Sequence, residues 1–392
     1  MKKKLILHPD TFLWIKGSKG LLYNASKYIS DEFGISGGIG DICNKLLDYD
    51  NLYSVEIETD DLSKDVKNFI QLITSNYGAI QEIDSPYISL PPLLNLQHTE
   101  AKLSYLSSVT FYLGGKCETS DYYRQVVYPV NTEVHLSSKD IVKFLNTSRP
   151  SYPKRINLVV SDVTEYEYLK GIMKDLSFIK KNVVFYSLLT DKNKGMLTDL
   201  AKDFGYKFTF ICRTCSVYDS TIEEMNRYGS FSLLILNDED YSRWDNLTEG
   251  NAIGNYNMIP VYDNNIKFFE ENIYLNKEDL KNIKLPKREV FAHQAINTNF
   301  FGDITVMPNG KVFSNVNFPS IGSLNDTLHE IINNEMKDSN AWRLLRDSGR
   351  CRKCLYQWLC PSISNYELVI GRNDLCRLPE SKNASPTYAI KN

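Results

Sequence analysis

The stretch VVFYSLLTDKNKGMLTDLAKDFGYKFTFIC, residues 183–212, contains an apolar strand pattern, an amphipathic helix pattern and a second apolar strand pattern. Continuous apolar runs are typical of parallel strands that are buried on both faces. A helix between two such strands indicates a βαβ unit, in which the helix packs on the sheet. The same alternation extends from this stretch toward both ends of the chain.

Six strand candidates lie between residues 105 and 295, namely Val109–Leu113, Ile156–Val160, Val183–Leu189, Phe208–Cys212, Phe231–Leu236 and Met258–Tyr262. Amphipathic helix candidates separate them, near 138–146, 165–175, 194–204, 219–228, 239–247 and 265–273. Six units are fewer than the eight of a closed barrel. The predicted fold class is therefore α/β, with a partial (β/α)6 barrel over residues 105–295.

The first 83 residues have another pattern. Short β-like runs separated by turn residues predict a small antiparallel meander of Lys4–Leu7, Phe12–Ile15 and Gly20–Tyr23. A helix over 39–47, a strand over 53–57 and a second helix follow, and this second helix carries apolar residues at helical spacing. We expect a winged-helix-like domain over 1–83 and a proline-containing linker over 84–104.

Composition narrows the class of protein. The 392 residues carry a net charge of −3 and 42% hydrophobic residues, which predicts two or three domains and excludes a basic footprint for nucleic acid. The apolar run after Lys2–Lys4 is too short for a signal peptide, and no run of 18 apolar residues indicates a membrane span. We therefore expect a cytoplasmic protein, in which eight cysteines point to metal or redox chemistry.

Residues 296–392 contain the most specific motif. A predicted hairpin, Asp303–Met307 and Lys311–Phe313, and a helix near 325–336 precede Cys351-x2-Cys354-x5-Cys360, with Cys376 further on. Four thiolates of this spacing suit a four-cysteine zinc site or a [4Fe–4S] cluster. The alternative is four cysteines that share no site.

This spacing resembles the SPASM domain of radical-SAM peptide maturases. The resemblance implies a SPASM-like domain over 296–392, in which Cys351, Cys354, Cys360 and Cys376 ligate one auxiliary [4Fe–4S] cluster. Ser364 and Asn315 stand where the family has cysteines of a second auxiliary cluster. The resemblance therefore implies one cluster rather than two, with zinc as the alternative metal.

The six βα units resemble the partial barrel of radical-SAM enzymes, which carry CxxxCxxC after the first strand. Here the loop Gly114–Asp121 contains only Cys117, and CxxxCxxC occurs nowhere in the chain. Ser161-Asp162-Val163 follows the second strand in place of the family's glycine-rich turn. The resemblance implies that the chain neither binds S-adenosylmethionine nor performs radical chemistry.

The N-terminal domain resembles the RiPP recognition element, which binds the leader of a ribosomally made precursor peptide. In that family the leader joins the third strand and packs on the third helix. The matching residues are Leu21, Leu22, Tyr23 and Asn24 on the strand and Val66, Phe69, Ile70 and Ile73 on the helix. A structural or dimerisation module is the alternative.

The complete layout is similar to pseudo-radical-SAM proteins of Bacteroidales systems that modify GG-type peptides. The stretches 12–15, 22–24 and 360–367 carry this similarity. It implies a non-catalytic partner that binds the precursor peptide and a catalytic radical-SAM protein. Two alternatives stay open: an enzyme of another class that uses Cys117, Cys212 and Cys215 at the barrel mouth, and a zinc-stabilised scaffold that binds other proteins.

Overall fold

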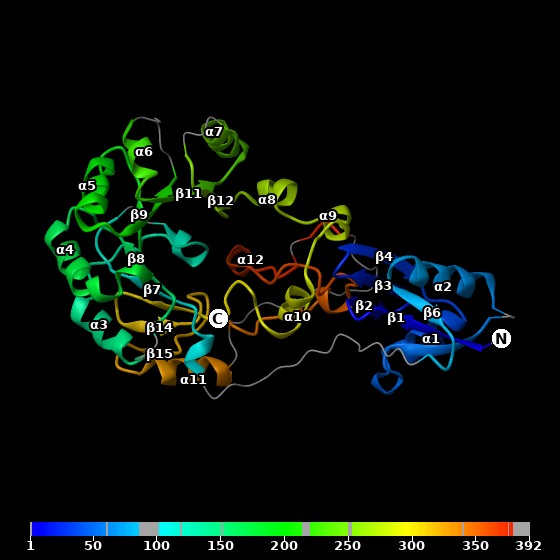
Figure 1. Ribbon diagram of the computed structural model, residues 1–392. Coiled ribbons are helices and arrows are strands. Elements are labelled where there is room, and N and C mark those ends of the chain that lie inside the picture. Colours follow the sequence, from blue (N-terminus) through cyan, green and yellow to red (C-terminus); the bar gives the residue numbers. More distant parts are fainter. Residues whose placement is uncertain are drawn as a thin grey trace.

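The computed structural model describes residues 2–59, 62–85, 102–117, 120–149, 152–213, 220–249, 253–338, 341–374 and 376–378. Three parts follow one another in space (Figure 1): a small N-terminal module, a C-terminal segment that contains the cysteines, and a large α/β part. The predicted linker lies mostly outside the described residues, as does the chain from Pro379. No helix of the described part is long and apolar enough to cross a membrane.

A nine-stranded sheet forms the core of the α/β part, in the order β12-β11-β10-β9-β8-β7-β13-β14-β15. Its first six strands are parallel and confirm the six predicted strands to within two residues at each end. They are β7 (Ser108–Tyr112), β8 (Arg155–Val160), β9 (Val183–Leu188), β10 (Lys207–Cys212), β11 (Gly229–Ile235) and β12 (Tyr256–Pro260).

The predicted helices are also present and lie on the outer face of this sheet (Figure 1). They are α3 (Ser138–Asn146), α4 (Tyr166–Asp175), α5 (Lys194–Phe204), α6 (Ser220–Met225), α7 (Asp238–Glu249) and α8 (Ile266–Asn272). Short 3-10 turns are η2 (Lys102–Tyr105), η3 (Asp121–Arg124) and η4 (Ser177–Asn182). Phe111, Leu158 and Phe210 are fully buried against the helices, and each such side chain contributes about 1.5–3 kcal/mol of burial free energy.

The sheet curves strongly. Gln125 follows β7, yet its side-chain amide bonds both backbone groups of Tyr262, which follows β12. Five strand spacings of about 4.8 Å separate β7 from β12 along the sheet. The direct contact therefore fits an open barrel in which the loop after the first strand reaches across the concave face to the last parallel strand.

The predicted hairpin is confirmed, and it extends the same sheet. β13 (Asp303–Val306) runs parallel to β7, and β14 (Lys311–Phe313) and β15 (Gly322–Ser323) follow in antiparallel order. Helix α11 (Leu328–Asp338) is the helix predicted near 325–336. The sheet thus continues across the expected domain boundary at residue 295.

The N-terminal module corrects the predicted meander. β1 (Lys2–Leu7) lies between β5 (Ser54–Glu58) and β6 (Gly78–Gln81), which cover both of its edges. The meander consists instead of β2 (Thr11–Lys16), β3 (Lys19–Asn24) and β4 (Ile29–Gly34). Helices α1 (Gly38–Leu47) and α2 (Lys64–Asn76) complete the module, with η1 (Tyr49–Asn51) between α1 and β5.

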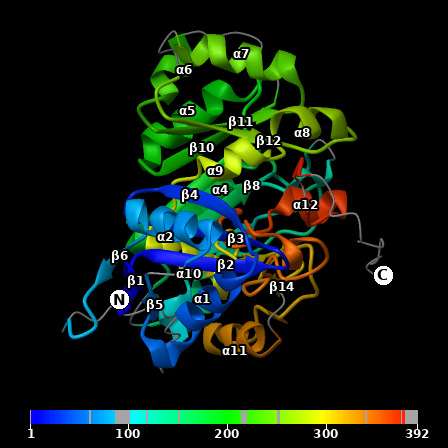
Figure 2. The same ribbon diagram turned by 90° about the vertical axis from the view of Figure 1, so that its right-hand side faces the viewer.

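The β2-β3-β4 sheet is shared between two cores. One face carries Leu13 and Leu22 into the core of the module, where α1 and α2 pack. The other face carries Phe12, Leu21 and Tyr23 into a core built with the C-terminal segment. That segment contributes α9 (Lys277–Lys281), α10 (Lys287–Ala295), η5 (Cys351–Lys353) and α12 (Asn365–Ile370), and Figure 2 shows the module in front of it.

Candidate functional site

The four cysteines predicted to bind metal lie in the C-terminal segment beside the N-terminal module. Cys351 begins the η5 turn and Cys354 follows it, so this turn presents both side chains. Cys360 lies one short loop further on, and Cys376 is held by a bridge to Leu275. All four are half-buried.

The thiols lie near enough to affect one another. Burial raises the pKa of Cys351 to about 11, and the neighbouring Cys376 and Cys354 add to this while Arg346 opposes it. Burial likewise raises the pKa of Cys360 to about 12, again against Arg346. A metal offsets such a burial cost because it binds the thiolate form.

The donor set is chemically suited to a thiolate-bound metal or cluster. Zinc, with Zn–S distances of about 2.3 Å, requires its ligands to converge closely. No group of three or more His, Cys, Asp or Glu side chains in the described ranges is placed to hold a single metal ion. A [4Fe–4S] cluster keeps its four thiolates further apart, one on each iron.

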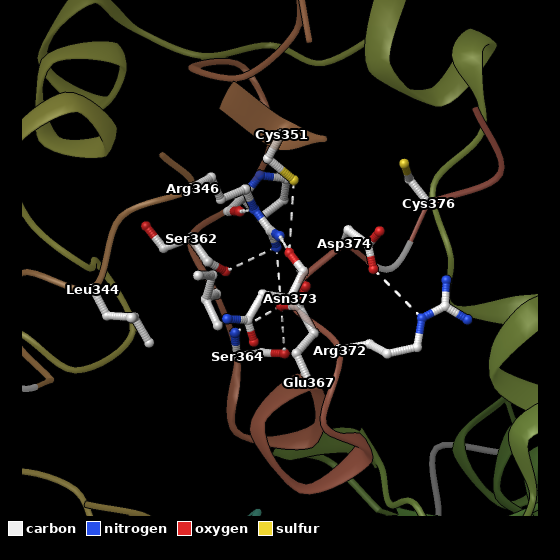
Figure 3. A network of polar contacts seen from close by, with 12 residues as sticks. Leu344, Arg346, Cys351, Ser362, Ser364, Glu367, Arg372, Asn373, Asp374 and Cys376 are labelled. Carbon is white, nitrogen blue, oxygen red and sulfur yellow. Dashed lines mark hydrogen bonds and ion pairs between the residues drawn. The ribbon is translucent and has the colours of Figure 1, made fainter. Parts of the chain in front are cut away.

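A buried ion pair organises the surroundings of these cysteines (Figure 3). The Arg346 guanidinium bonds both carboxylate oxygens of Glu367 at 2.8 and 2.9 Å, and both side chains are almost fully buried. Glu367 in turn accepts from the N–H and hydroxyl of Ser364 at the start of α12. A buried pair of this kind is stable only when its other hydrogen bonds are made.

Ser364 and Asn315, the residues at the positions where the SPASM family has cysteines of a second cluster, make polar contacts in the structure. Ser364 caps α12, and the Asn315 side-chain amide donates to the Asn365 side-chain oxygen at 2.6 Å. Asn315 lines a cavity of about 420 Å³ on the concave face, together with Thr110, Arg155 and Asp303. Ordinary barrels fill this space with branched apolar side chains, whereas here it is largely polar.

The mouth of the open barrel is filled by the loop after β7. Tyr122 and Tyr128 are buried there with their rings 5.4 Å apart, and they pack with Val159 and Val261. The Tyr122 hydroxyl donates to Asp263 at 2.6 Å. Gly114, at φ +86°, starts this loop, and a Cβ there would lie 1.9 Å from the Val134 carbonyl oxygen. The chain thus occupies its own mouth with aromatic side chains.

The three other candidate cysteines do not form a described site. Cys117 lies in the loop after β7. Cys212 is buried among the residues that face the helices, on the opposite side of β10 from the concave face. Cys215 lies outside the described residues. The predicted grouping of Cys212 with Cys117 at the mouth is therefore wrong, because alternation along β10 turns Cys212 outward.

The structure also corrects the predicted peptide-binding residues. Leu21, Leu22, Tyr23 and Asn24 lie on β3, which is the central strand and is paired with β2 and β4 along its length. A strand paired on both sides cannot accept a third partner. Val66, Phe69, Ile70 and Ile73 are buried in the core of the module rather than exposed for a ligand.

The edge strand beside α2 is β4, which pairs only with β3 among the described strands. Its Phe33 ring lies 4.6 Å from the Phe69 ring of α2, so strand and helix are adjacent. On its other face, Glu32 pairs with Lys277 and accepts from the Tyr356 hydroxyl. The apolar residues Ile29 and Phe33 at alternating positions are the sequence signal for this strand, which the predicted meander did not include.

Arg346, Arg350 and Glu367 were also not predicted from the sequence. The Ser364-x-x-Glu367 spacing is a capping-box signal for α12 and places Glu367 at the helix start. Arg350 is adjacent to Cys351 in the sequence, but no pattern places either arginine beside the Cys376 loop, because only the fold brings these segments together.

No family model matches the chain, and no curated protein matches its sequence. In fold it is similar to solved structures of Streptococcus suis SuiB. SuiB bound to S-adenosylmethionine is 13% identical with a TM-score of 0.42, over 96% of this chain and 100% of that chain. SuiB alone is 12% identical with a TM-score of 0.44, over 95% of this chain and 100% of that chain. SuiB bound to precursor peptide SuiA is 12% identical with a TM-score of 0.42, over 97% of this chain and 100% of that chain. So loose a superposition gives no correspondence between residues.

Proposed function

We propose that this chain is a non-catalytic partner of a radical-SAM peptide maturase. It binds the precursor peptide and carries one [4Fe–4S] cluster on Cys351, Cys354, Cys360 and Cys376. The observation that carries the proposal is the barrel mouth, where Tyr122 and Tyr128 occupy the space beside a loop with a single cysteine. A radical-SAM cluster needs three cysteines in that loop and an open place for S-adenosylmethionine.

The cluster proposal is supported by the donor set. Four half-buried thiols lie near enough to affect one another's pKa. Four sulfur ligands suit a [4Fe–4S] cluster, and a four-cysteine zinc site is the alternative. The cluster would supply a structural link among the loops, or a one-electron carrier.

The precursor peptide is proposed to bind at the edge of β4, because β3 is paired on both sides. Strand addition requires backbone N–H and C=O groups along an uncovered edge, with neighbouring surface for alternate side chains. No second strand pairs with β4 among the described strands, and α2 lies beside it through Phe33 and Phe69. Helix α9 contacts the same strand through Ser30 and Glu32. Tyr28, 40% exposed at the start of β4, offers an aromatic contact to an incoming peptide.

The first test combines metal content with turnover. The anaerobically purified chain should contain about four iron and four sulfide. With dithionite and S-adenosylmethionine it should release no 5′-deoxyadenosine. Release of 5′-deoxyadenosine would contradict the non-catalytic role, and one zinc without iron would contradict the cluster.

The second test addresses the peptide. Fluorescent leader peptides of ribosomally made precursors are titrated against the chain, and amide hydrogen exchange is followed along β4. Binding should protect residues 29–34, and Tyr28→Ala should weaken it while Tyr49→Ala, another exposed tyrosine of the module, should not. Protection elsewhere in the module, with β4 unchanged, would exclude this edge.

A further inference from the structure

We infer that Arg346 and Arg350 are positioning residues of the four-cysteine site and that Arg350 donates a hydrogen bond to a ligand sulfur. The inference rests on the proposed cluster site and adds two side chains to it. Both arginines precede Cys351 on one segment, four residues apart. Both reach the loop that carries Cys376, and Arg346 also reaches the loop that carries Cys360.

Arg346 ties three loops together. Its guanidinium donates to the Pro361 carbonyl, next to Cys360, and to the Asn373 carbonyl at 2.7 Å, three residues before Cys376. Its own carbonyl accepts from the Gln357 side chain at 2.8 Å, between Cys354 and Cys360. Glu367 balances its charge in this buried place, as Figure 3 shows. The guanidinium thus sets the separation of loops that share no regular secondary structure.

Arg350 contacts a ligand directly. Its Nη2 lies 2.8 Å from the Cys376 sulfur, the Cys376 carbonyl oxygen and the Asp374 carbonyl oxygen, and its two N–H groups are shared among these three acceptors. Its Nε lies 2.9 Å from an Asp374 carboxylate oxygen. In the described part of the loop around Cys376, the pairing given is one bridge to Leu275. Arg350 adds three hydrogen bonds to this part of the loop.

These contacts predict two separable effects. A guanidinium N–H that donates to a thiolate sulfur stabilises the electron-rich form, and hydrogen bonds to the sulfurs raise the reduction potential of a cluster. Side chains that fix ligand loops change metal affinity about 10–100-fold on mutation. Removing Arg350 should lower the potential, whereas perturbing Arg346 should mainly lower cluster retention.

The test compares Arg350→Gln, Arg350→Lys and Arg346→Lys with Arg343→Gln, an exposed arginine of the same segment. Iron content, visible spectrum, midpoint potential and the rate of iron release to a chelator are measured on anaerobic protein. We expect Arg350→Gln to give a more negative potential together with about 10–100-fold faster release, and Arg346→Lys to give faster release at a potential near that of the wild type. Arg350→Lys, which keeps a cationic N–H donor, should recover part of both, and Arg343→Gln should equal the wild type.

Failure of the inference differs from failure of the cluster. An iron-loaded Arg350→Gln with wild-type potential and release rate overturns the role of Arg350, and the cluster stands. A wild type that binds zinc instead overturns the cluster, and the arginines are then tested by the rate of zinc transfer to a chelator. A wild type that binds neither metal overturns both. Because Arg350 is half-buried, Arg350→Gln keeps the test valid even where Arg346→Lys fails to fold.

Discussion

Tyr23 and Leu285 bond each other twice although 262 residues separate them: the Tyr23 hydroxyl donates to the Leu285 carbonyl at 2.7 Å and accepts from its N–H at 2.8 Å. Tyr23 is on the central strand of the meander, and Leu285 lies between α9 and α10. This pair therefore joins the N-terminal module to the segment that also packs on the cysteine loops.

Tyr23→Phe should destabilise the chain by about 1–3 kcal/mol, because both backbone groups of Leu285 lose their partner in a buried place. Urea unfolding followed by tryptophan fluorescence measures the change. Tyr28→Phe, an exposed tyrosine of the same sheet, is the matched control and should be near neutral. Equal effects of the two substitutions would show that the pair contributes nothing specific.

Removing the metal should loosen the meander. The Lys16 ammonium donates to the Arg352 carbonyl, inside the Cys351–Cys354 turn, at 2.9 Å, and Tyr356 between two candidate ligands bonds Glu32 of β4. We expect faster amide exchange over 11–34 in the metal-free protein, and unchanged exchange in β1 and in β8–β10. Equal amide exchange over 11–34 in the metal-bound and the metal-free protein would show that the cysteine loops keep their shape without metal.

His293 predicts a loss of stability at acid pH. Burial lowers the pKa of His293, and the nearby Arg346 lowers it further. The hydrogen bond to the Trp358 carbonyl and the charge of Glu289 act in the opposite direction, but the net pKa is lowered. A folded-state pKa below the unfolded value means that the unfolded chain binds the proton first, so this contribution is complete above about pH 6.5 and is lost as pH falls further. His293→Gln should flatten the unfolding free energy between about pH 7 and 5, and His329→Gln, an exposed histidine, should leave the profile unchanged.

Replacing a candidate ligand should weaken metal binding. Cys351→Ser and Cys376→Ser each remove one thiolate of the site, so we expect iron to fall clearly below about four per chain. Cys117→Ser is the control, because Cys117 lies in the loop after β7, away from these loops. Iron loss in the control as well would place the metal elsewhere.

The tyrosines in the barrel mouth should contribute to stability. Tyr122→Phe removes the hydrogen bond to Asp263 and should cost about 0.5–1.5 kcal/mol, since Asp263 is exposed and water can replace the lost donor. Thermal unfolding checks the value. Tyr241→Phe, whose ring is half-exposed on α7, serves for comparison. A neutral Tyr122→Phe would mean that the hydrogen bond to Asp263 adds nothing measurable to the stability of the loop.

Local patterns predicted the strands and helices of the α/β part well. Runs such as Ile156–Val160 are apolar over their whole length because both faces of the strand are buried, and such runs are visible without a structure. The hairpin at Pro308-Asn309-Gly310 was also predictable from the sequence, because glycine favours the positive φ that the turn requires. Gly310 has φ +78° in the structure. Which strands pair with one another was harder to predict from the sequence. β1 and β2 have similar residue patterns, and only the folded structure shows that β5 and β6 pair with both edges of β1.

For the site, the four cysteines, their spacing and the lack of CxxxCxxC follow directly from the sequence, because ligand type and short spacing are local properties of the chain. Three features required the folded structure: β3 is the central strand and β4 the edge, Cys212 faces the helices, and Arg346 and Arg350 reach the cysteine loops. These depend on contacts between distant segments, such as Arg346 with Asn373 and Tyr23 with Leu285, which packing and burial select and which leave no periodic trace in the sequence.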